Sequence, residues 1–316
     1  MDTGERLLEI YRRLLEVFGP QGWWPADDDF EMVVGAILTQ STAWVNVEKA
    51  IARLKAGGML DAVALEAVPE GVLAGWIRSS GYFNVKARKL KAFCRHLRDH
   101  HGGRLDSLFH VKLPELRQEL LSIWGVGEET ADSIVLYGAR QPIFVADAYT
   151  RRIFACLGLT PPGAGYRQLQ QLFMEKLPPS VPLFQEYHAL IVALGKDRCR
   201  PAPLCPGCPI RDLCPTAGMV GLGTSPWGEG ANRYRLSLWE RPPEGRVRAR
   251  STLQAEPSPR PSRRGEGTDP CPLGPLPRLA LSPRPSSQAG QSGRSWSSPS
   301  RSPPRSGRRG PPPAPW

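Results

Sequence analysis

Four cysteines lie within a stretch of sixteen residues, and their spacing restricts the possible folds more than any other feature of the chain. Cys199, Cys205, Cys208 and Cys214 follow the pattern C-x5-C-x2-C-x5-C. Thiolates so close in sequence can surround one metal centre, either zinc or an iron–sulfur cluster. Structural zinc sites usually use two C-x2-C pairs, whereas this stretch contains one. The spacing therefore favours a compact 4Fe–4S loop, with zinc as the alternative.

The cellular compartment is predicted from the start of the chain and from its apolar runs. The segment from Met1 to Arg6 has neither the basic start nor the apolar core of a signal peptide. The longest apolar runs are broken by charges well short of a membrane span. We therefore expect a cytoplasmic protein with no membrane partner, whose thiols ligate metal rather than form disulfides. Cys94 and Cys156 fall on apolar helical faces and are predicted core residues.

Most of the positive charge lies in the C-terminal third. The net charge is +11, and residues 221–316 supply +10 of it through 16 Arg, no Lys and 6 acidic residues. This segment also holds 19 of the 34 prolines, so we predict a disordered tail, in which Cys271 has no assigned role. Its composition favours a dispensable extension, with a non-specific nucleic-acid tether as the alternative. Bulk charge therefore says little about the partners of the first 220 residues.

Residues 1–220 are predicted to be helical throughout. Apolar residues recur at helical spacing in the first segment, and Gly, Pro and Asp residues separate the segments that follow. The later predicted helices lie near residues 30–40, 43–55, 60–66, 69–78, 84–101, 113–122, 128–139, 147–158, 166–177 and 182–195. The short apolar run Pro142–Val145 could be a strand, but the sequence offers no partner strand for it.

A glycine-rich turn and an aspartate carry the second signal. Gly125, Val126 and Gly127 separate two predicted helices, and the free N–H groups of the second helix can bind a DNA phosphate. A turn of this kind also occurs in ordinary helical proteins. Asp147 stands where a later helix begins, so it can cap that helix. A carboxylate held ionised there can also stabilise a positive transition state.

These motifs, taken in order, resemble the endonuclease III branch of the helix-hairpin-helix base-excision DNA glycosylases. The turn at Gly125, then Asp147, then the four cysteines are collinear with the pattern of that family. Residues 30–42 resemble its early helix, which would end in a DNA-probing glutamine at Gln40. Residues 81–87 resemble the segment that precedes its long middle helix. The resemblance spans about residues 5–218.

The resemblance implies an all-α, two-lobed helix-hairpin-helix DNA glycosylase fold with a C-terminal iron–sulfur cluster loop. Residues 1–23 would form an N-terminal helix that joins the cluster lobe, and residues 24–141 a helical bundle with the hairpin. Residues 142–220 would carry the catalytic Asp and the 4Fe–4S cluster, followed by the tail 221–316. The implied form is a monomer in the bacterial cytosol. Its partner would be double-stranded DNA with a damaged base, through which it associates with the nucleoid.

Two departures from the family pattern refine the predicted chemistry. Members with lyase activity carry a lysine before Thr130, and this chain has Glu129 there, so no amine can form a Schiff base with the sugar at that position. Adenine-specific members need a glutamate in the early helix, where this chain has Gly35. We therefore expect a glycosylase without lyase activity that does not act on adenine. The first gap between cysteines is also one residue shorter than is usual in the family.

The sequence around Glu129 and Asp147 looks most like the 3-methyladenine DNA glycosylase III subgroup. In that subgroup the flipped base is expected between aromatic groups, and the resemblance makes Trp24, Pro25 and Trp44 the candidates here. Core packing is nearly as good an interpretation for Trp44. An electron-rich wall would select cationic alkylated purines such as 3-methyladenine.

Basic residues surround the first cysteine. Lys196, Arg198 and Arg200 could contact DNA phosphates, and a solvated basic loop is an equally good interpretation. His188 lies on the helix that leads to the cysteines, and we expect it to be packed and hydrogen-bonded rather than catalytic. The alternatives to an alkylpurine enzyme are a glycosylase for oxidised pyrimidines or mismatched bases, a non-enzymatic cluster-bearing DNA-binding protein, and a zinc-binding module.

Overall fold

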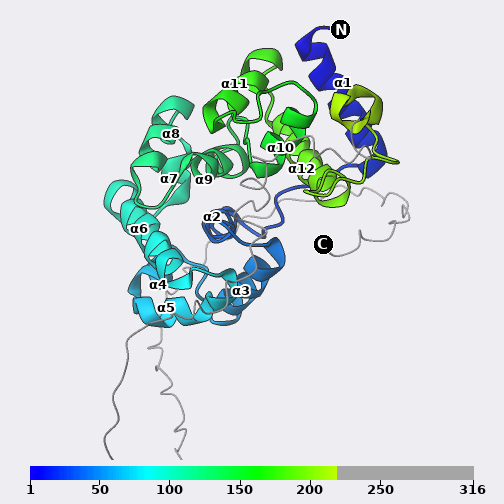
Figure 1. Ribbon diagram of the computed structural model, residues 1–316. Helices are drawn as coiled ribbons and strands as arrows, with labels where there is room; N and C mark the ends of the chain where they lie inside the picture. Colours follow the sequence, from blue (N-terminus) through cyan, green and yellow to red (C-terminus); the bar gives the residue numbers. More distant parts are fainter. Residues whose placement is uncertain (219–316) are drawn as a thin grey trace, which may run out of the picture. The chain divides into compact units, whose positions relative to one another are not determined.

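The computed structural model describes residues 1–218, so the predictions for the tail and for Cys271 lie outside the described part. Every regular element within residues 1–218 is helical, which confirms the predicted all-α fold (Figure 1). The α-helices are α1 (Thr3–Phe18), α2 (Asp29–Leu38), α3 (Trp44–Ala56), α4 (Ala62–Ala67), α5 (Glu70–Trp76), α6 (Phe83–His101), α7 (Leu105–Phe109), α8 (Leu113–Ser122), α9 (Glu128–Ser133), α10 (Ala148–Cys156), α11 (Tyr166–Lys176) and α12 (Val181–Asp197). The shorter elements are η1 (Arg78–Ser80), the π-helical η2 (Ile134–Gly138), η3 (Arg211–Leu213) and η4 (Pro215–Gly218).

Local sequence explains where several helices begin and end. The side chain of Asp2 accepts a hydrogen bond from the N–H of Glu5, whose carboxylate accepts one from the N–H of Asp2, so a capping box begins α1. Asp28 caps α2 by accepting from the N–H of Glu31. Gly102 ends α6 with a φ of 59°, a left-handed conformation in which glycine has no Cβ to clash. These boundaries therefore rest on contacts within a few residues.

The predicted helices all occur, with ends that differ by at most two residues when η2 is taken as the continuation of α9. The sequence did not predict α7, which has only five residues. The run Pro142–Val145 is irregular, so the possibility of a strand there is not realised. Its apolar side chains are nevertheless buried, and the Phe144 ring stacks on Phe173 with centroids 3.7 Å apart. Hydrophobic burial, rather than strand pairing, accounts for this run.

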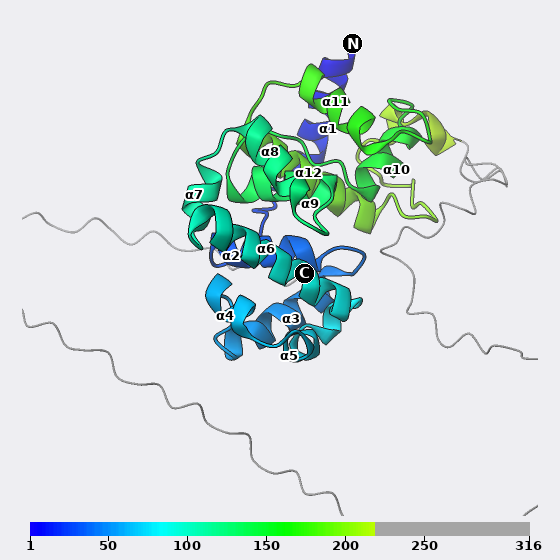
Figure 2. The ribbon, with the colours of Figure 1, turned by 90° about the vertical axis from the view of Figure 1, so that its left-hand side faces the viewer.

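The first helix of the chain packs against the last ones. α1 contacts α11 and α12, and α10 contacts the same two helices. In a second group, α6 contacts α2, α4, α5 and α7, while α3 packs against α2 and α5. Figure 2 shows α3, α4 and α5 together at one end and α1 and α11 at the other. This grouping is compatible with the predicted lobes, whose boundaries at residues 23 and 141 stay a prediction.

α2 is the most enclosed of these helices and leads directly to the candidate site. Its residues from Glu31 to Leu38 are all buried, and it contacts α3, α6, α9 and η2. η2 in turn contacts α12, so a short path of packed elements joins the two groups of helices. Within residues 1–218, no helix combines the length and the apolar character that a membrane span requires.

Candidate active site and cysteine pocket

Asp147 is the N-cap of α10, as the sequence predicts, and only 8% of its surface is exposed. Its Oδ1 accepts two hydrogen bonds from Thr150, one from the backbone N–H and one from the hydroxyl, both at 2.8 Å. Burial raises the pKa of Asp147, but nearby His188 and the donors of Thr150 outweigh it and hold the pKa below the usual value. Asp147 is therefore an ionised carboxylate near neutral pH, held at the positive end of a helix.

A buried histidine and tyrosine lie next to this carboxylate. His188, on α12, places Nε2 at 3.7 Å from Oδ2 of Asp147. The other ring nitrogen, Nδ1, is 2.6 Å from the hydroxyl of Tyr137, which belongs to η2. His188 is thus packed and hydrogen-bonded, as the sequence predicts. Nε2 of His188 therefore faces the carboxylate of Asp147, a contact that the sequence did not predict.

The carboxyl group of Glu129 has the opposite electrostatic environment. Glu129 lies in the first turn of α9. In the family that the sequence resembles, members with lyase activity carry a lysine at this position. Burial and the negative charge of Asp147 raise the pKa of Glu129 to about 8, although Arg151 acts in the other direction. At neutral pH the site therefore combines an ionised Asp147 with a protonated Glu129. Such separation of two carboxyl pKa values is a common sign of divided acid and base roles.

Three tryptophans form an aromatic cluster that extends to this site. Trp24 lies at its centre, with ring centroids 5.7 Å from Trp23, 5.4 Å from Trp44 and 5.4 Å from Tyr137. Tyr137 is the residue that contacts His188, so the cluster is one residue removed from the partner of Asp147. The structure thus brings the predicted residues Trp24 and Trp44 together. It adds Trp23 and Tyr137, which the sequence did not single out.

Small and polar neighbours shape this cluster. A Cβ at Gly35 would lie 3.2 Å from Nε1 of Trp24, so the absence of a side chain at residue 35 gives the indole its space. The buried Nε1 atoms of Trp23 and Trp24 have no hydrogen-bond partner among the described residues. Nζ of Lys196 lies 5.6 Å from the Trp23 ring centroid. Pro25, the third predicted pocket residue, is exposed.

The predicted hairpin turn is held by a side chain from the end of α2. Gly125 has a φ of 87°, which only glycine adopts readily. Nε2 of Gln40 donates to the carbonyl of Gly125 at 3.2 Å and to the hydroxyl of Thr130 at 2.9 Å. Nζ of Lys89 donates to the other end of the Gln40 amide. The predicted DNA-probing glutamine is therefore anchored to the hairpin in this structure.

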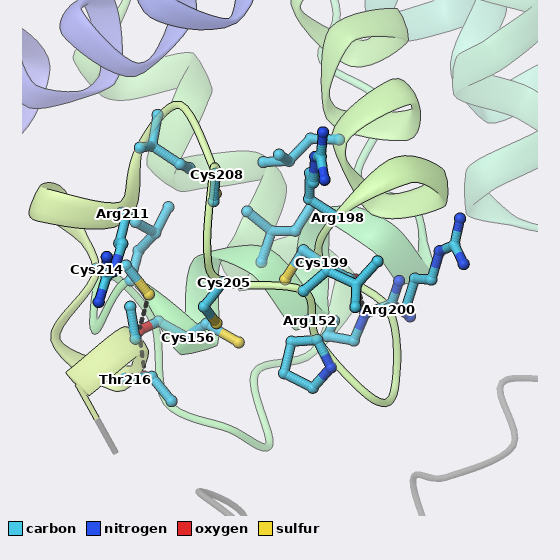
Figure 3. Close-up of a pocket in the computed structure, with 17 residues that line it drawn as sticks. Arg152, Cys156, Arg198, Cys199, Arg200, Cys205, Cys208, Arg211, Cys214 and Thr216 are labelled. Carbon is cyan, nitrogen blue, oxygen red and sulfur yellow. Dashed lines mark hydrogen bonds between the residues drawn. The ribbon is translucent and has the colours of Figure 1, made fainter. Parts of the chain in front are cut away.

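The four clustered cysteines line one pocket between α10, α12 and the loop that follows (Figure 3). The pocket contains about 570 Å³ of empty space, part of which is open to solvent. Cys156, at the end of α10, lines the same pocket and is only partly buried, so its prediction as a core residue was incomplete. Cys94 is buried, as predicted.

A single zinc ion and an iron–sulfur cluster place different demands on the distances between cysteine sulfurs. Sulfurs bound tetrahedrally at about 2.3 Å from one zinc would lie about 4 Å apart. In residues 1–218, the only three ligand atoms of His, Cys, Asp or Glu within 4.8 Å of one another belong to histidines and a glutamate, not to cysteines. A 4Fe–4S cluster binds each sulfur through a different iron and holds the sulfurs farther apart. The four thiols line one pocket, a donor set that suits either group, and the choice of the cluster stays a prediction.

The neighbours of one cysteine favour its thiolate form, whereas burial raises the pKa of Cys205 and Cys208. Cys156 donates to the sulfur of Cys199 and, with the positive charge of Arg152, lowers the pKa of Cys199 despite its burial. Nε of Arg152 donates to the carbonyl of Cys199 at 2.8 Å. Arg6, on α1, donates to the carbonyls of Leu157 and Leu213 at 2.9 and 2.7 Å. The N-terminal helix is thus fastened to the cysteine loop.

Comparisons with known proteins assign this arrangement to a family. Residues 34–179 match the model of the HhH-GPD superfamily base excision DNA repair protein. A protein of Methanocaldococcus jannaschii, named "Putative DNA repair glycosylase MJ1434", is 44% identical over 211 residues, which are 66% of this chain and 96% of that protein. The chain belongs to the HhH-GPD superfamily of base excision DNA repair glycosylases. Escherichia coli endonuclease III is 27% identical over 186 residues, which cover 58% of this chain and 82% of the enzyme.

Solved structures agree with the endonuclease III-like fold. A non-covalent endonuclease III–DNA complex matches 69% of this chain and 98% of its own with a TM-score of 0.60, at 24% sequence identity. The H. pylori 3-methyladenine DNA glycosylase bound to 1,N6-ethenoadenine matches 62% of this chain and 98% of its own, with a TM-score of 0.54 and 25% identity. This glycosylase therefore shares its fold with an endonuclease III and with a 3-methyladenine DNA glycosylase.

One contact in this glycosylase's candidate site, between Tyr137 and His188, could not be predicted from the sequence. Tyr137 and His188 are 51 residues apart in sequence, and the contact between them depends on how η2 packs against α12. Arg198 lines the cysteine pocket, whereas Lys196 extends toward Trp23, so the predicted basic residues face different neighbours. Arg200 is exposed and donates to the carbonyl of Lys196.

Proposed function

We propose that this glycosylase is monofunctional and hydrolyses the N-glycosidic bond of alkylated purines such as 3-methyladenine in double-stranded DNA. The observation that carries the proposal is the tryptophan cluster, which is connected through Tyr137 and His188 to an ionised Asp147, with a carboxyl group in place of the lyase amine. The fold shared with the H. pylori 3-methyladenine DNA glycosylase supports it.

The aromatic cluster would bind the flipped base. Alkylated purines carry a positive charge, which is attracted to the electron-rich faces of Trp24 and Trp44. The indole N–H groups of Trp23 and Trp24 are buried donors without partners among the described residues, and they could donate to acceptor atoms of the base. A neutral, undamaged base would gain the hydrogen bonds from the indole N–H groups but not the cation–π attraction, so the pocket would favour the charged lesion.

Asp147 would act on the sugar. As the glycosidic bond breaks, positive charge develops on the deoxyribose, and a fixed carboxylate stabilises it without having to reorient. The same carboxylate could orient or deprotonate the attacking water, which adds to the sugar while the base leaves with its electron pair. A cationic base is a good leaving group and needs little help from an acid.

The position of Glu129 argues against lyase chemistry. Schiff-base formation needs an unprotonated amine, and the side chain at this position is a carboxyl group, protonated near neutral pH. The product would therefore be an abasic site in an intact strand.

DNA would be held by the hairpin and by basic residues at the end of α12. The backbone around Gly125, Val126 and Gly127 would receive a phosphate, and Lys196 and Arg198 would add charge contacts. Gln40 would leave its bonds to the hairpin and fill the space of the flipped nucleotide. The four residues Cys199, Cys205, Cys208 and Cys214 would hold a 4Fe–4S cluster, and their ligation would fix the conformation of the loop in which they lie.

The lesion preference can be tested by changing the charge of the base and the electron density of the pocket. Trp24→Phe keeps an aromatic ring but weakens its cation–π attraction. We expect it to lower base release from 3-methyladenine DNA several-fold relative to release of a neutral lesion such as hypoxanthine. Trp76→Phe, on α5 outside the cluster, is the matched control. Activity on an oxidised pyrimidine or a mismatch, with none on 3-methyladenine, would retain the family and refute this substrate.

A further inference from the structure

Two histidines and a glutamate converge at the junction of α6 and α8, away from the residues described so far. Nε2 of His96 and Nε2 of His101 lie 2.7 and 2.6 Å from the same oxygen, Oε1 of Glu119. Both histidines belong to the last part of α6, and Glu119 lies on α8. The exposed fractions of the side chains are 15%, 9% and 23%, so the group is largely screened from solvent.

This arrangement has the donor set and the compactness of a metal site. Two imidazole nitrogens and one carboxylate oxygen are the protein ligands of several catalytic zinc sites, where water completes the coordination. The three ligand atoms lie within 4.8 Å of one another, a closeness that no other such set among residues 1–218 reaches. The cysteine pocket, by contrast, does not meet this limit.

The remaining ring nitrogen of His101 is also provided with a partner. Its Nδ1 lies 3.1 Å from the hydroxyl of Ser107, on α7. When Nδ1 donates its proton to that hydroxyl, the lone pair of Nε2 faces Glu119. Metal-binding histidines are commonly oriented by such an outer hydrogen bond. A lone pair on Nε2 of His101 and one on Oε1 of Glu119, with the two atoms 2.6 Å apart, repel each other unless a proton or a cation lies between them.

We propose that His96, His101 and Glu119 bind a divalent transition-metal ion of the zinc type. The ion would lie between the two imidazole nitrogens and the carboxylate oxygen, and water would occupy its open position. The ligands come from α6 and α8, and α8 runs directly into the turn at Gly125. Metal binding would therefore fasten the first helix of the hairpin to the long helix beside it.

The site can be tested with Ni²⁺ on the full chain, with the metal at its cysteines left in place and loosely bound ions removed by chelation. Calorimetry should detect binding of one equivalent per chain to these three ligands. His101→Gln and Glu119→Gln keep side-chain size and hydrogen-bonding capacity, and each should weaken binding at least tenfold. Saturating Ni²⁺ should also raise the melting temperature of the wild-type protein but not that of the variants, because only a folded site binds.

His110→Gln is the matched control, because His110 lies outside the set and bonds the carbonyl of Asp106. It is preferred to His100, whose ring lies 4.4 Å from that of His96. Circular dichroism would verify that each variant is folded. The absence of Ni²⁺ binding to the wild-type protein, or equal binding by His101→Gln and His110→Gln, would overturn the proposal. Base release measured on the same samples reports separately on the proposed glycosylase activity.

Discussion

Asp147 combines two tasks that a sequence alone cannot separate. Its side chain caps α10 through Thr150, and the same hydrogen bonds keep it ionised despite its burial. A carboxylate that served only as a cap could be exposed and isolated. Here His188 lies 3.7 Å away, and the electrostatic influence of Asp147 reaches Glu129. These neighbours are what make the residue a candidate catalyst.

Replacing Asp147 by Asn should separate the two tasks. The amide oxygen can still accept from Thr150, so α10 should keep its cap, but the negative charge is lost. We expect base release under single-turnover conditions to fall on the order of 10²–10³-fold, with DNA affinity nearly unchanged. Parallel titrations with fluorescent duplex DNA would measure the affinity. A matching loss of binding and turnover would contradict the catalytic role.

Glu129 should make the stability of the protein depend on pH. Its folded pKa, about 8, lies above the ordinary value of 4.5, so the folded state holds the proton more tightly. The stabilisation from this group is complete below pH 4.5 and is lost as the pH rises through 8. Urea denaturation should therefore show wild-type stability falling from pH 5.5 to 8.5 relative to Glu129→Gln. Parallel curves for the two proteins would exclude a raised pKa.

At the scale of helices, the sequence predicts what depends on neighbours in the chain. Periodic apolar residues and breakers located ten helices after the first, and an acidic cap marked the start of α10. The sequence did not predict α7, because five residues are too few to show a helical period. The irregular run Pro142–Val145 looked ambiguous because its burial comes from aromatic packing on α11 rather than from a local pattern.

The candidate site was predicted unevenly for the same reason. Asp147, Trp24 and the four cysteines stand out by type and spacing. The contact between His188 and Tyr137 is not visible in the sequence, because it forms only when η2 packs on α12. Cys156 joined the cysteine pocket for a similar reason, since the end of α10 meets a loop more than 40 residues later in the chain.

The contribution of the contacts between α1 and the cysteine loop can be measured as a change in the free energy of unfolding. Arg6→Ala removes the donor to two carbonyls, those of Leu157 and Leu213, in a partly buried place. We expect a loss of about 1–3 kcal/mol in the free energy of unfolding by urea. Arg12→Ala, whose ion pairs on the same helix are exposed, should cost clearly less. Equal effects of the two substitutions would show that the fastening contributes nothing.

For the molecule as a whole, the comparisons and the charge distribution point to one functional unit at the N-terminal side. The M. jannaschii relative aligns over 96% of its own length but over 66% of this chain. The residues beyond 221 carry most of the net positive charge, so a tail that binds DNA would add salt-dependent affinity without chemistry. The proposed excision of a base depends only on residues that the structure describes.

The most direct test of that proposal is base release from duplex DNA containing methylated purines, with each reaction divided into alkali-treated and untreated halves. We expect free 3-methyladenine in both halves and strand breaks only after alkali, because hydrolysis leaves an abasic site. Strand breaks without alkali, trapped as a covalent adduct by borohydride, would contradict the monofunctional mechanism. The absence of any methylated base among the products would contradict the proposed substrate.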